Sequence, residues 1–493
     1  MIKNIKWLFL VSLTFIACND DETVTYDSAD GLPLTAGTAD FTKYVALGDS
    51  FAAGFSDGAL FIEGQKNAYP NILAQQFALV GGGEFTTPLM ADNFGGLLLG
   101  GIPIQGVRLY FNGVTPLSVT GAPTTEVTNH LSGFFNNMGI PGAKSFHLIA
   151  PGYGNTAGVA GGTASPYFSR FSSNTTTTVL ADALSQTPTF FSLWIGGNDV
   201  LGYALTGGDG TNPITPTNTF NGAYNTIASQ LAAGGRKGVV ANLPYVGSLP
   251  HFTTVPYNPV LLDLETANKL NSVEAYGAYN AGITQAFAYL VANNLMSQAD
   301  ADAEKAKRTI TFRAGSGNAV VIMDEYLTNL TGINPALVSM RQATAEDLIV
   351  LPASSFIGTA VGGDPSKVNG VSVPLADKWV LSKNEISELK AATDAYNAII
   401  QAAATANDLA FVDAKAIMTQ LSTTGITANN YTLNTAFATG GAFSLDGFHP
   451  TPRGYALIAN EFIKAINAKY GSNLKGVNLG DYRILFPRDA ANF

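Results

Sequence analysis

The positions of apolar residues predict an alternation of strands and helices along this chain. Four nearly unbroken apolar runs are typical of parallel strands that are covered on both faces: 44–47, 189–195, 238–241 and 409–412. The segments between them favour helices, with apolar residues at helical spacing in the first: 67–80, 223–233 and 382–406. This alternation predicts a central parallel sheet in an α/β fold.

The last predicted helix has the clearest pattern. Thr451 suits the N-cap position and Pro452 the first helical position. The apolar residues that follow fall on one face of a helix: Tyr455, Ile458, Ala459, Phe462, Ile463, Ile466 and Tyr470. We expect this helix to close the sheet.

Two long segments interrupt the alternation. Residues 81–135 contain short apolar runs between glycine pairs, which predicts a strand-and-loop insertion. Residues 245–380 form a second insertion, with a helical stretch at 267–306 and a hairpin that pairs Thr309–Phe312 with Val320–Met323. A capping-box pattern, Ser382 to Glu385, then opens the next helix.

The amino terminus has the pattern of a targeting segment. Lys3 and Lys6 precede 11 apolar or small residues, Trp7 to Ala17, a stretch too short to span a bilayer. We therefore expect residues 1–17 to be a signal peptide. Cys18 is the single cysteine, and its position after Ala17 resembles the lipobox of bacterial lipoproteins, in which the thiol is acylated.

Lipidation at Cys18 would anchor the chain to a bacterial membrane, outside the cytoplasm, because several acyl chains together give stable anchoring. The acidic run at 20–22 is similar to runs that accompany export to the cell surface in some Gram-negative groups, which favours the outer membrane. A solvated tether is the alternative interpretation of that run. Residues 18–40 are polar and without period, as expected of a flexible tether.

Composition excludes several functions. The net charge of −10 and the absence of a basic stripe argue against a nucleic-acid partner. Charged residues make up only 13% of the chain, and a neutral polar surface of this kind suits an extracytoplasmic protein. With four histidines, a histidine-rich metal cluster is not expected.

Candidate chemistry begins at Gly48-Asp49-Ser50, directly after the first apolar run. Side chains at the carboxyl ends of parallel strands line the crevice in which open α/β sheets bind ligands. Ser50 is therefore a candidate nucleophile, and a serine that caps the next helix is the alternative. Ser56 lies in a Gly-x-Ser-x-Gly pattern, but no strand directly precedes it, so we reject it as nucleophile.

A histidine and an aspartate near the end of the chain have the spacing of a catalytic pair. In Asp446-Gly447-Phe448-His449, the carboxylate can fold back to accept a hydrogen bond from the imidazole Nδ1. The other imidazole nitrogen is then free to take a proton from a serine hydroxyl. A surface turn is the alternative reading of this segment.

Four segments occur in the order found in one hydrolase family: 48–50, 137–142 (a tight turn by composition), 196–199 and 446–449. The chain thus resembles the GDSL-type, or SGNH, hydrolases. The resemblance implies a three-layer α/β/α flavodoxin-like fold over 41–473, with the two insertions, followed by an extension at 474–493. It also implies that Ser50 is the nucleophile, His449 the general base and Asp446 its orienting group.

The same resemblance implies an oxyanion hole made by the backbone N–H groups of Ser50 and Gly142 and by the side-chain amide of Asn198. Gly139 is the alternative to Gly142. Hydrogen-bond donors aimed at the developing negative charge are each worth about 3 kcal/mol. Asp199 and Arg453 lie near the site in sequence and are expected to have structural roles.

The sequence therefore predicts a serine ester hydrolase of the lipase, acylhydrolase or esterase kind that acts through an acyl-enzyme. Neither a metal nor an organic cofactor is needed for this chemistry. Lipid esters, acetylated glycans and short-chain esters are all compatible substrates. Acyl transfer at the same site and a surface binding protein on this scaffold are the alternatives, because binding sites concentrate on loops such as the two insertions.

Overall fold

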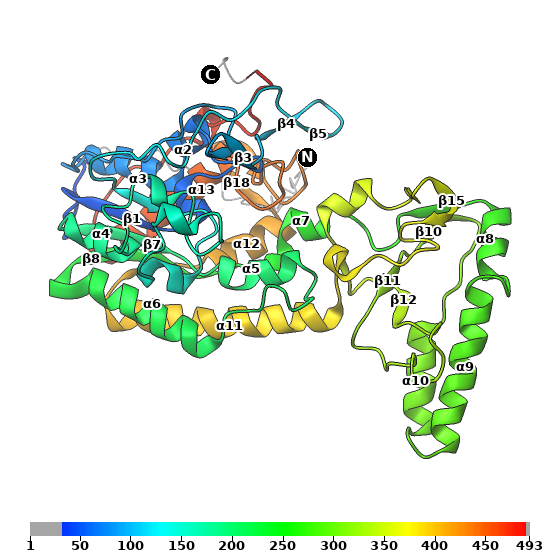
Figure 1. The fold of residues 1–493 in the computed structure, drawn as a ribbon. Coiled ribbons are helices and arrows are strands. Elements are labelled where there is room, and N and C mark those ends of the chain that lie inside the picture. The colour runs from blue at the N-terminus through cyan, green and yellow to red at the C-terminus, as the bar shows by residue number, and fades with distance from the viewer. Residues whose placement is uncertain (1–31, 490–493) are drawn as a thin grey trace, which may run out of the picture.

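A five-stranded parallel sheet lies at the centre of the molecule (Figure 1), for which a computed structural model describes residues 32–489. The order of its strands across the sheet is β17-β8-β7-β1-β6, and every neighbouring pair is parallel. This order is that of the flavodoxin-like fold. The strands are β1 (Tyr44–Gly48), β6 (Asn137–Gly139), β7 (Phe190–Trp194), β8 (Lys237–Ala241) and β17 (Ala410–Val412).

Helices cover both faces of this sheet. On one face α13 (Pro452–Tyr470) packs on α3 (Tyr69–Ala78), and on the other α6 (Thr217–Ala232) packs on α11 (Lys383–Ala406). Shorter helices complete the layers: α1 (Ser50–Ala53), α2 (Ile62–Lys66), α4 (Val179–Ser185), α5 (Asn198–Leu205) and α12 (Ala414–Thr423). The three-layer α/β/α architecture is therefore confirmed.

Most predicted elements of the sheet and its helices are confirmed to within a few residues. Thr451 caps α13 through its hydroxyl, which accepts from the Gly454 N–H, and both bonds of the Ser382–Glu385 capping box are present. The tight turn expected at 137–142 is a turn only at its end, because β6 occupies Asn137–Gly139. A three-residue edge strand that contains Asn and Gly has no apolar run by which the sequence could predict it.

The two insertions lie outside the central sheet. In the first insertion the strands form two hairpins: β2 (Leu97–Leu99) pairs with β3 (Ile102–Gln105), and β4 (Leu109–Phe111) pairs with β5 (Pro116–Ser118). The second forms a lobe beside the α/β unit, at the right of Figure 1. Its main helices are α7 (Pro250–Thr253), α8 (Leu264–Asn271), α9 (Tyr276–Ala292) and α10 (Gln298–Arg308).

The hairpin predicted in this lobe is wrong. β11 (Val321–Met323) pairs with β12 (Met340–Gln342), whereas β10 (Gly315–Asn318) pairs with β9 (Val260–Leu262). Residues 309–313 are instead held by side chains of the preceding helices, since Asn280 and Asn271 accept from the N–H groups of Ile310 and Phe312. The remaining short strands are β13 (Leu348–Ile349), β14 (Ala360–Val361), β15 (Asp364–Val368), β16 (Val380–Leu381), β18 (Ile426–Ala428) and β19 (Tyr431–Leu433).

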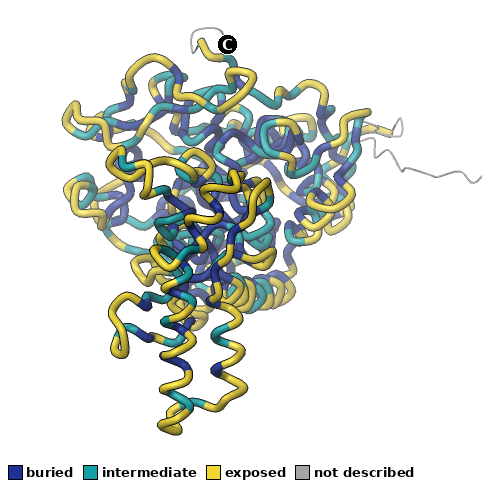
Figure 2. Tube along the Cα trace, turned by 90° about the vertical axis from the view of Figure 1, so that its right-hand side faces the viewer, coloured by how far each residue is buried: buried dark blue, intermediate teal, exposed yellow. Residues whose placement is uncertain are grey.

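Burial differs between the two parts of the molecule. Figure 2 shows buried residues concentrated in the α/β unit, whereas much of the pair α9 and α10 is exposed. Within residues 32–489 no helix combines the length and the apolar character needed to cross a bilayer. The expected signal peptide, the lipidation site Cys18 and most of the tether lie outside the described residues.

Candidate active site

Ser50 stands at the point where β1 ends and α1 begins. The side chain of Asp49 caps α1 by accepting from the Phe51 N–H at 3.0 Å. Gly48 has no space for a side chain, because a Cβ there would lie 2.6 Å from the carbonyl oxygen of Trp194 on β7. The sharp change from strand to helix delivers the Ser50 hydroxyl to the carboxyl edge of the sheet, where the strand order reverses between β1 and β7.

The structure brings Ser50, His449 and Asp446 together although about 400 residues separate the first from the others. The Ser50 Oγ lies 2.9 Å from the His449 Nε2, to which it donates, and the His449 Nδ1 donates to the Asp446 Oδ2 at 2.8 Å. The His449 and Asp446 side chains are 13% and 12% exposed, which leaves a narrow opening to solvent. The arrangement is that of a nucleophile, a base and an orienting carboxylate.

Asp446 is surrounded by hydrogen-bond donors. Its Oδ1 accepts from the N–H groups of Phe448 and His449, each at 2.9 Å, and from the Ser444 hydroxyl at 3.2 Å. Burial alone would raise the pKa of Asp446, but the charge of His449 and these hydrogen bonds outweigh it and hold the pKa well below its ordinary value. The carboxylate therefore stays ionised next to the imidazole.

A further donor to Asp446 comes from the segment that carries the rejected serine. The Gly58 N–H donates to the Asp446 Oδ2 at 2.9 Å. Ser56 is buried, and its hydroxyl donates to the Pro450 carbonyl oxygen at 3.1 Å, so it supports the segment that carries His449. The role of Gly58 cannot be predicted from the sequence, because a backbone N–H leaves no signature in residue type.

Aromatic rings and a second histidine fix the position of His449. The rings of Phe51 and Phe55 pack against its imidazole, with centroids 5.5 Å and 4.6 Å away. His251 stacks on Phe448 at 3.9 Å, and its Nδ1 lies 3.2 Å from the Asp446 carbonyl oxygen. Burial lowers the pKa of His251 to about 4, so its imidazole is neutral behind the site. The sequence did not predict a place for His251 at the site, because no acidic residue lies at a suggestive spacing from it.

Asn198 begins α5, directly beyond the carboxyl end of β7. Its Nδ2 donates to the Ala143 carbonyl oxygen at 3.0 Å, which ties it to the turn that contains Gly142. Gly142 has a φ of 78°, and a Cβ there would meet no atom within 4 Å. The Gly139 N–H is already used by the Asn137 side chain at 3.0 Å inside β6. Gly142 is thus the better placed of the two alternatives.

The residues expected to be structural have partners that fit that role. Asp199 accepts from the Ser145 N–H at 2.7 Å and from its hydroxyl at 2.9 Å. The Arg453 Nε donates to the carbonyl oxygens of Leu479 and Tyr482, each at 3.0 Å. Through these bonds Arg453 holds the carboxyl-terminal segment against the first turn of α13.

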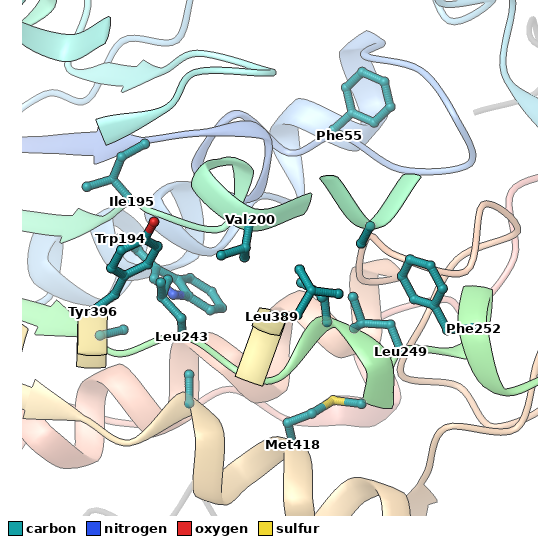
Figure 3. Close-up of a cluster of buried hydrophobic side chains, with 14 of the residues drawn as sticks. Phe55, Trp194, Ile195, Val200, Leu243, Leu249, Phe252, Leu389, Tyr396 and Met418 are labelled. Carbon is teal, nitrogen blue, oxygen red and sulfur yellow. The ribbon is translucent and has the colours of Figure 1, made fainter. Parts of the chain in front are cut away.

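A pocket opens beside Ser50, and an apolar cavity lies next to it. The pocket is lined by Asn198, Leu201, Leu243, Val246 and other residues, including Phe448 and His449. It shares Phe51, Trp194, Pro244 and Leu249 with a second cavity that is walled almost entirely by apolar atoms and extends between α12 and α13. Figure 3 shows Trp194, Leu249 and Met418, three residues of this second cavity.

The fold and the site together define an α/β protein with a serine, a histidine and an aspartate in hydrogen-bond contact at the switch point of the sheet. The family model described as GDSL-like lipase/acylhydrolase matches residues 44–305, and the chain belongs to this family of SGNH hydrolases. The matched residues include Ser50, Gly142 and Asn198, whereas Asp446 and His449 lie beyond them. A search of curated proteins and a search of solved structures each gave no significant match.

Proposed function

We propose that this hydrolase cleaves carboxylic esters through a covalent acyl-enzyme formed on Ser50. The observation that carries the proposal is the unbroken contact from the Ser50 hydroxyl through His449 to the Asp446 carboxylate. In the first step the His449 Nε2 takes the hydroxyl proton as the Ser50 Oγ attacks the ester carbonyl. The protonated imidazole then gives that proton to the leaving alcohol, and a water molecule activated by His449 releases the acid.

The negative charge that develops on the carbonyl oxygen requires donors in fixed positions. The N–H groups of Ser50 and Gly142 and the Nδ2 of Asn198 are proposed to supply them. The bond from Asn198 to the Ala143 carbonyl uses one of its two amide hydrogens and leaves the second for the substrate. Asn198 is held rigidly by this bond and by its position at the start of α5.

The apolar cavity beyond Phe51 and Trp194 favours an acyl group with a hydrocarbon chain over an acetyl group. Its walls offer almost no polar surface, and four of its lining residues also line the pocket of Ser50, so the two lie side by side. Burying each methylene of such a chain contributes about 0.8 kcal/mol. Ala414→Trp, which fills the cavity away from Ser50, should lower kcat/KM for a p-nitrophenyl decanoate at least about tenfold and spare the acetate. Equal effects on both esters would exclude the cavity as the acyl site.

Hydrolysis of p-nitrophenyl butyrate tests the function itself. Wild type should release nitrophenol, and Ser50→Ala should lower kcat by at least about 10³-fold. The control is Ser229→Ala, on the exposed face of α6, which should retain wild-type rates. Undiminished turnover by Ser50→Ala would contradict the proposal.

Acyl transfer remains the second candidate, because the same residues serve when an alcohol replaces water. Product analysis with and without glycerol separates the two: the proposed hydrolase yields the free acid in both.

For location, we propose that Cys18 carries the lipid anchor. Cys18→Ser should then move the protein from the membrane fraction to the soluble fraction, and a variant that stays in the membrane would exclude this anchor.

A further inference from the structure

Three carboxylates from separate segments meet where the lobe joins the α/β unit. Glu325 follows β11, Asp377 begins the short 3-10 helix η7 (Asp377–Trp379), and Glu385 lies in the first turn of α11. One carboxylate oxygen of each lies within 4.8 Å of the other two. Two of the segments belong to the lobe and the third to a helix that covers the sheet.

Glu385 gives the observation that points to a ligand. Its side chain is 1% exposed. The Oε2 accepts from the Ser382 N–H in the capping box, whereas the buried Oε1 accepts from no N–H or alcohol donor among residues 32–489. The carboxyl of Glu325 lies within hydrogen-bond reach of Glu385. A buried oxygen of this kind costs free energy unless a cation or a donor satisfies it.

The loop at Gly207 and Gly208 packs closely against these carboxylates. Gly207 and Gly208 both have positive φ, 63° and 73°. A Cβ on Gly208 would clash with the Glu385 Oε1, and one on Gly207 would clash with the Asp377 carbonyl oxygen. The glycine pair therefore lets the backbone of this loop approach the Glu385 Oε1 and the Asp377 carbonyl closely.

The basic residues near the three carboxylates have other partners. Arg341 binds Asp324 and Asp347, at 2.5 Å and 2.7 Å, and Lys383 binds Glu346 at 2.7 Å. None of the ion pairs within residues 32–489 includes Glu325, Asp377 or Glu385. Glu388, one turn along α11, adds further negative charge beside the hydroxyls of Tyr203 and Tyr326.

We propose that Glu325, Asp377 and Glu385 bind a calcium ion that fastens the lobe to α11. Calcium takes six to eight oxygen ligands at 2.3–2.6 Å and accepts carboxylates in flexible arrangements, so oxygens up to about 4.8 Å apart can share one ion. Backbone carbonyls and water complete such a shell. The ion would supply the charge that the described residues do not, and none of its three carboxylates lines the pocket of Ser50.

Calcium titration of the EDTA-treated, desalted protein tests the site, with thermal unfolding and terbium luminescence as readouts. Calcium at 1 mM should raise the Tm by about 3 °C, since only the folded chain gathers the three ligands. Terbium should be sensitised by excitation of Tyr326 and Tyr203, whose hydroxyls contact Glu388, and excess calcium should quench that emission.

Variants locate the ion. Glu385→Gln should lose both the Tm shift and the terbium signal, and so should Asp377→Asn, a partly exposed position at which a substitution disturbs folding less. Glu346→Gln, which removes an exposed carboxylate paired with Lys383, should keep both. The proposal is wrong if wild type shows neither signal, or if Glu385→Gln and Asp377→Asn keep them. A proton shared between Glu385 and Glu325 would produce that first outcome.

Discussion

Two buried carboxylates of this chain, Asp446 and Glu385, illustrate opposite solutions to the same problem. Asp446 accepts from the imidazole of His449, from three backbone N–H groups and from a hydroxyl, and its pKa lies well below the ordinary value. Glu385 has one donor to its Oε2 and none in the described residues to its Oε1. Burial, with Glu325 beside it, raises its pKa to about 8. A buried carboxylate stays charged only where donors or cations surround it.

The comparison separates a site that the chain completes itself from one that depends on a ligand. Around Asp446, backbone groups from the loop at Gly58 and from the turn before α13 supply the donors. At the junction of the lobe, the chain supplies three carboxylates and a loop of two glycines. The first arrangement suits a permanent catalytic group, and the second suits an ion.

The largest effect is expected from removing the charge of Asp446. In Asp446→Asn the side chain no longer holds the Nδ1–H tautomer of His449, so kcat/KM should fall by roughly 10⁴-fold. Steady-state kinetics of ester hydrolysis measure this fall in kcat/KM. Asp408→Asn, at an exposed carboxylate paired with Lys469, is the matched control and should change little. A loss of less than about tenfold in Asp446→Asn would mean that the donors around it serve the fold alone.

Asp57 is a third buried carboxylate, and its effect on stability should depend on pH. Its Oδ1 accepts from the Leu445 N–H at 2.9 Å, and burial raises its pKa to about 7. Because the folded chain binds this proton more tightly than the unfolded chain, its contribution to stability is complete below about pH 4 and is lost as the pH rises through 7. Between pH 5 and pH 8 wild type should lose about 3 kcal/mol relative to Asp57→Asn.

Urea unfolding of both proteins at the two pH values measures that difference, in which other titrating groups largely cancel. If the difference in unfolding free energy between the two proteins is the same at both pH values, Asp57, like Asp446, stays charged in the folded protein.

A smaller effect is expected at Asn198, where the chain again supplies its own donor. Asn198→Ala should lower kcat by about 10²- to 10³-fold and leave KM nearly unchanged, because the amide acts on the charge of the transition state. Asn242→Ala, at a buried asparagine beyond β8, serves as a comparison. If Asn198→Ala raised KM alone, the amide would be a substrate-binding group.

The sequence predicted the parts of this site that depend on local pattern. Ser50, Asp446, His449 and Asn198 follow apolar strands or precede a capped helix, and short segments show such relations. Gly58 and His251 were missed, because each contacts Asp446 across a long separation and carries no pattern of its own.

The lobe was harder to predict for a related reason. Its short strands pair with partners chosen by packing, as β10 with β9 and β11 with β12 show, and they lack the long apolar runs of the central sheet. The predicted hairpin would require a turn between its two strands, whereas residues 315–318 there form the strand β10, whose first two residues are exposed.

The most direct test of the catalytic assignment is covalent labelling with a fluorophosphonate probe, followed by mass spectrometry of the labelled peptide. Only a serine activated by its base reacts rapidly with such a probe. Wild type and Ser56→Ala should carry the adduct on Ser50, His449→Ala should label far more slowly, and Ser50→Ala should not label. Equal labelling of wild type and Ser50→Ala, or an adduct on Ser56, would contradict the account.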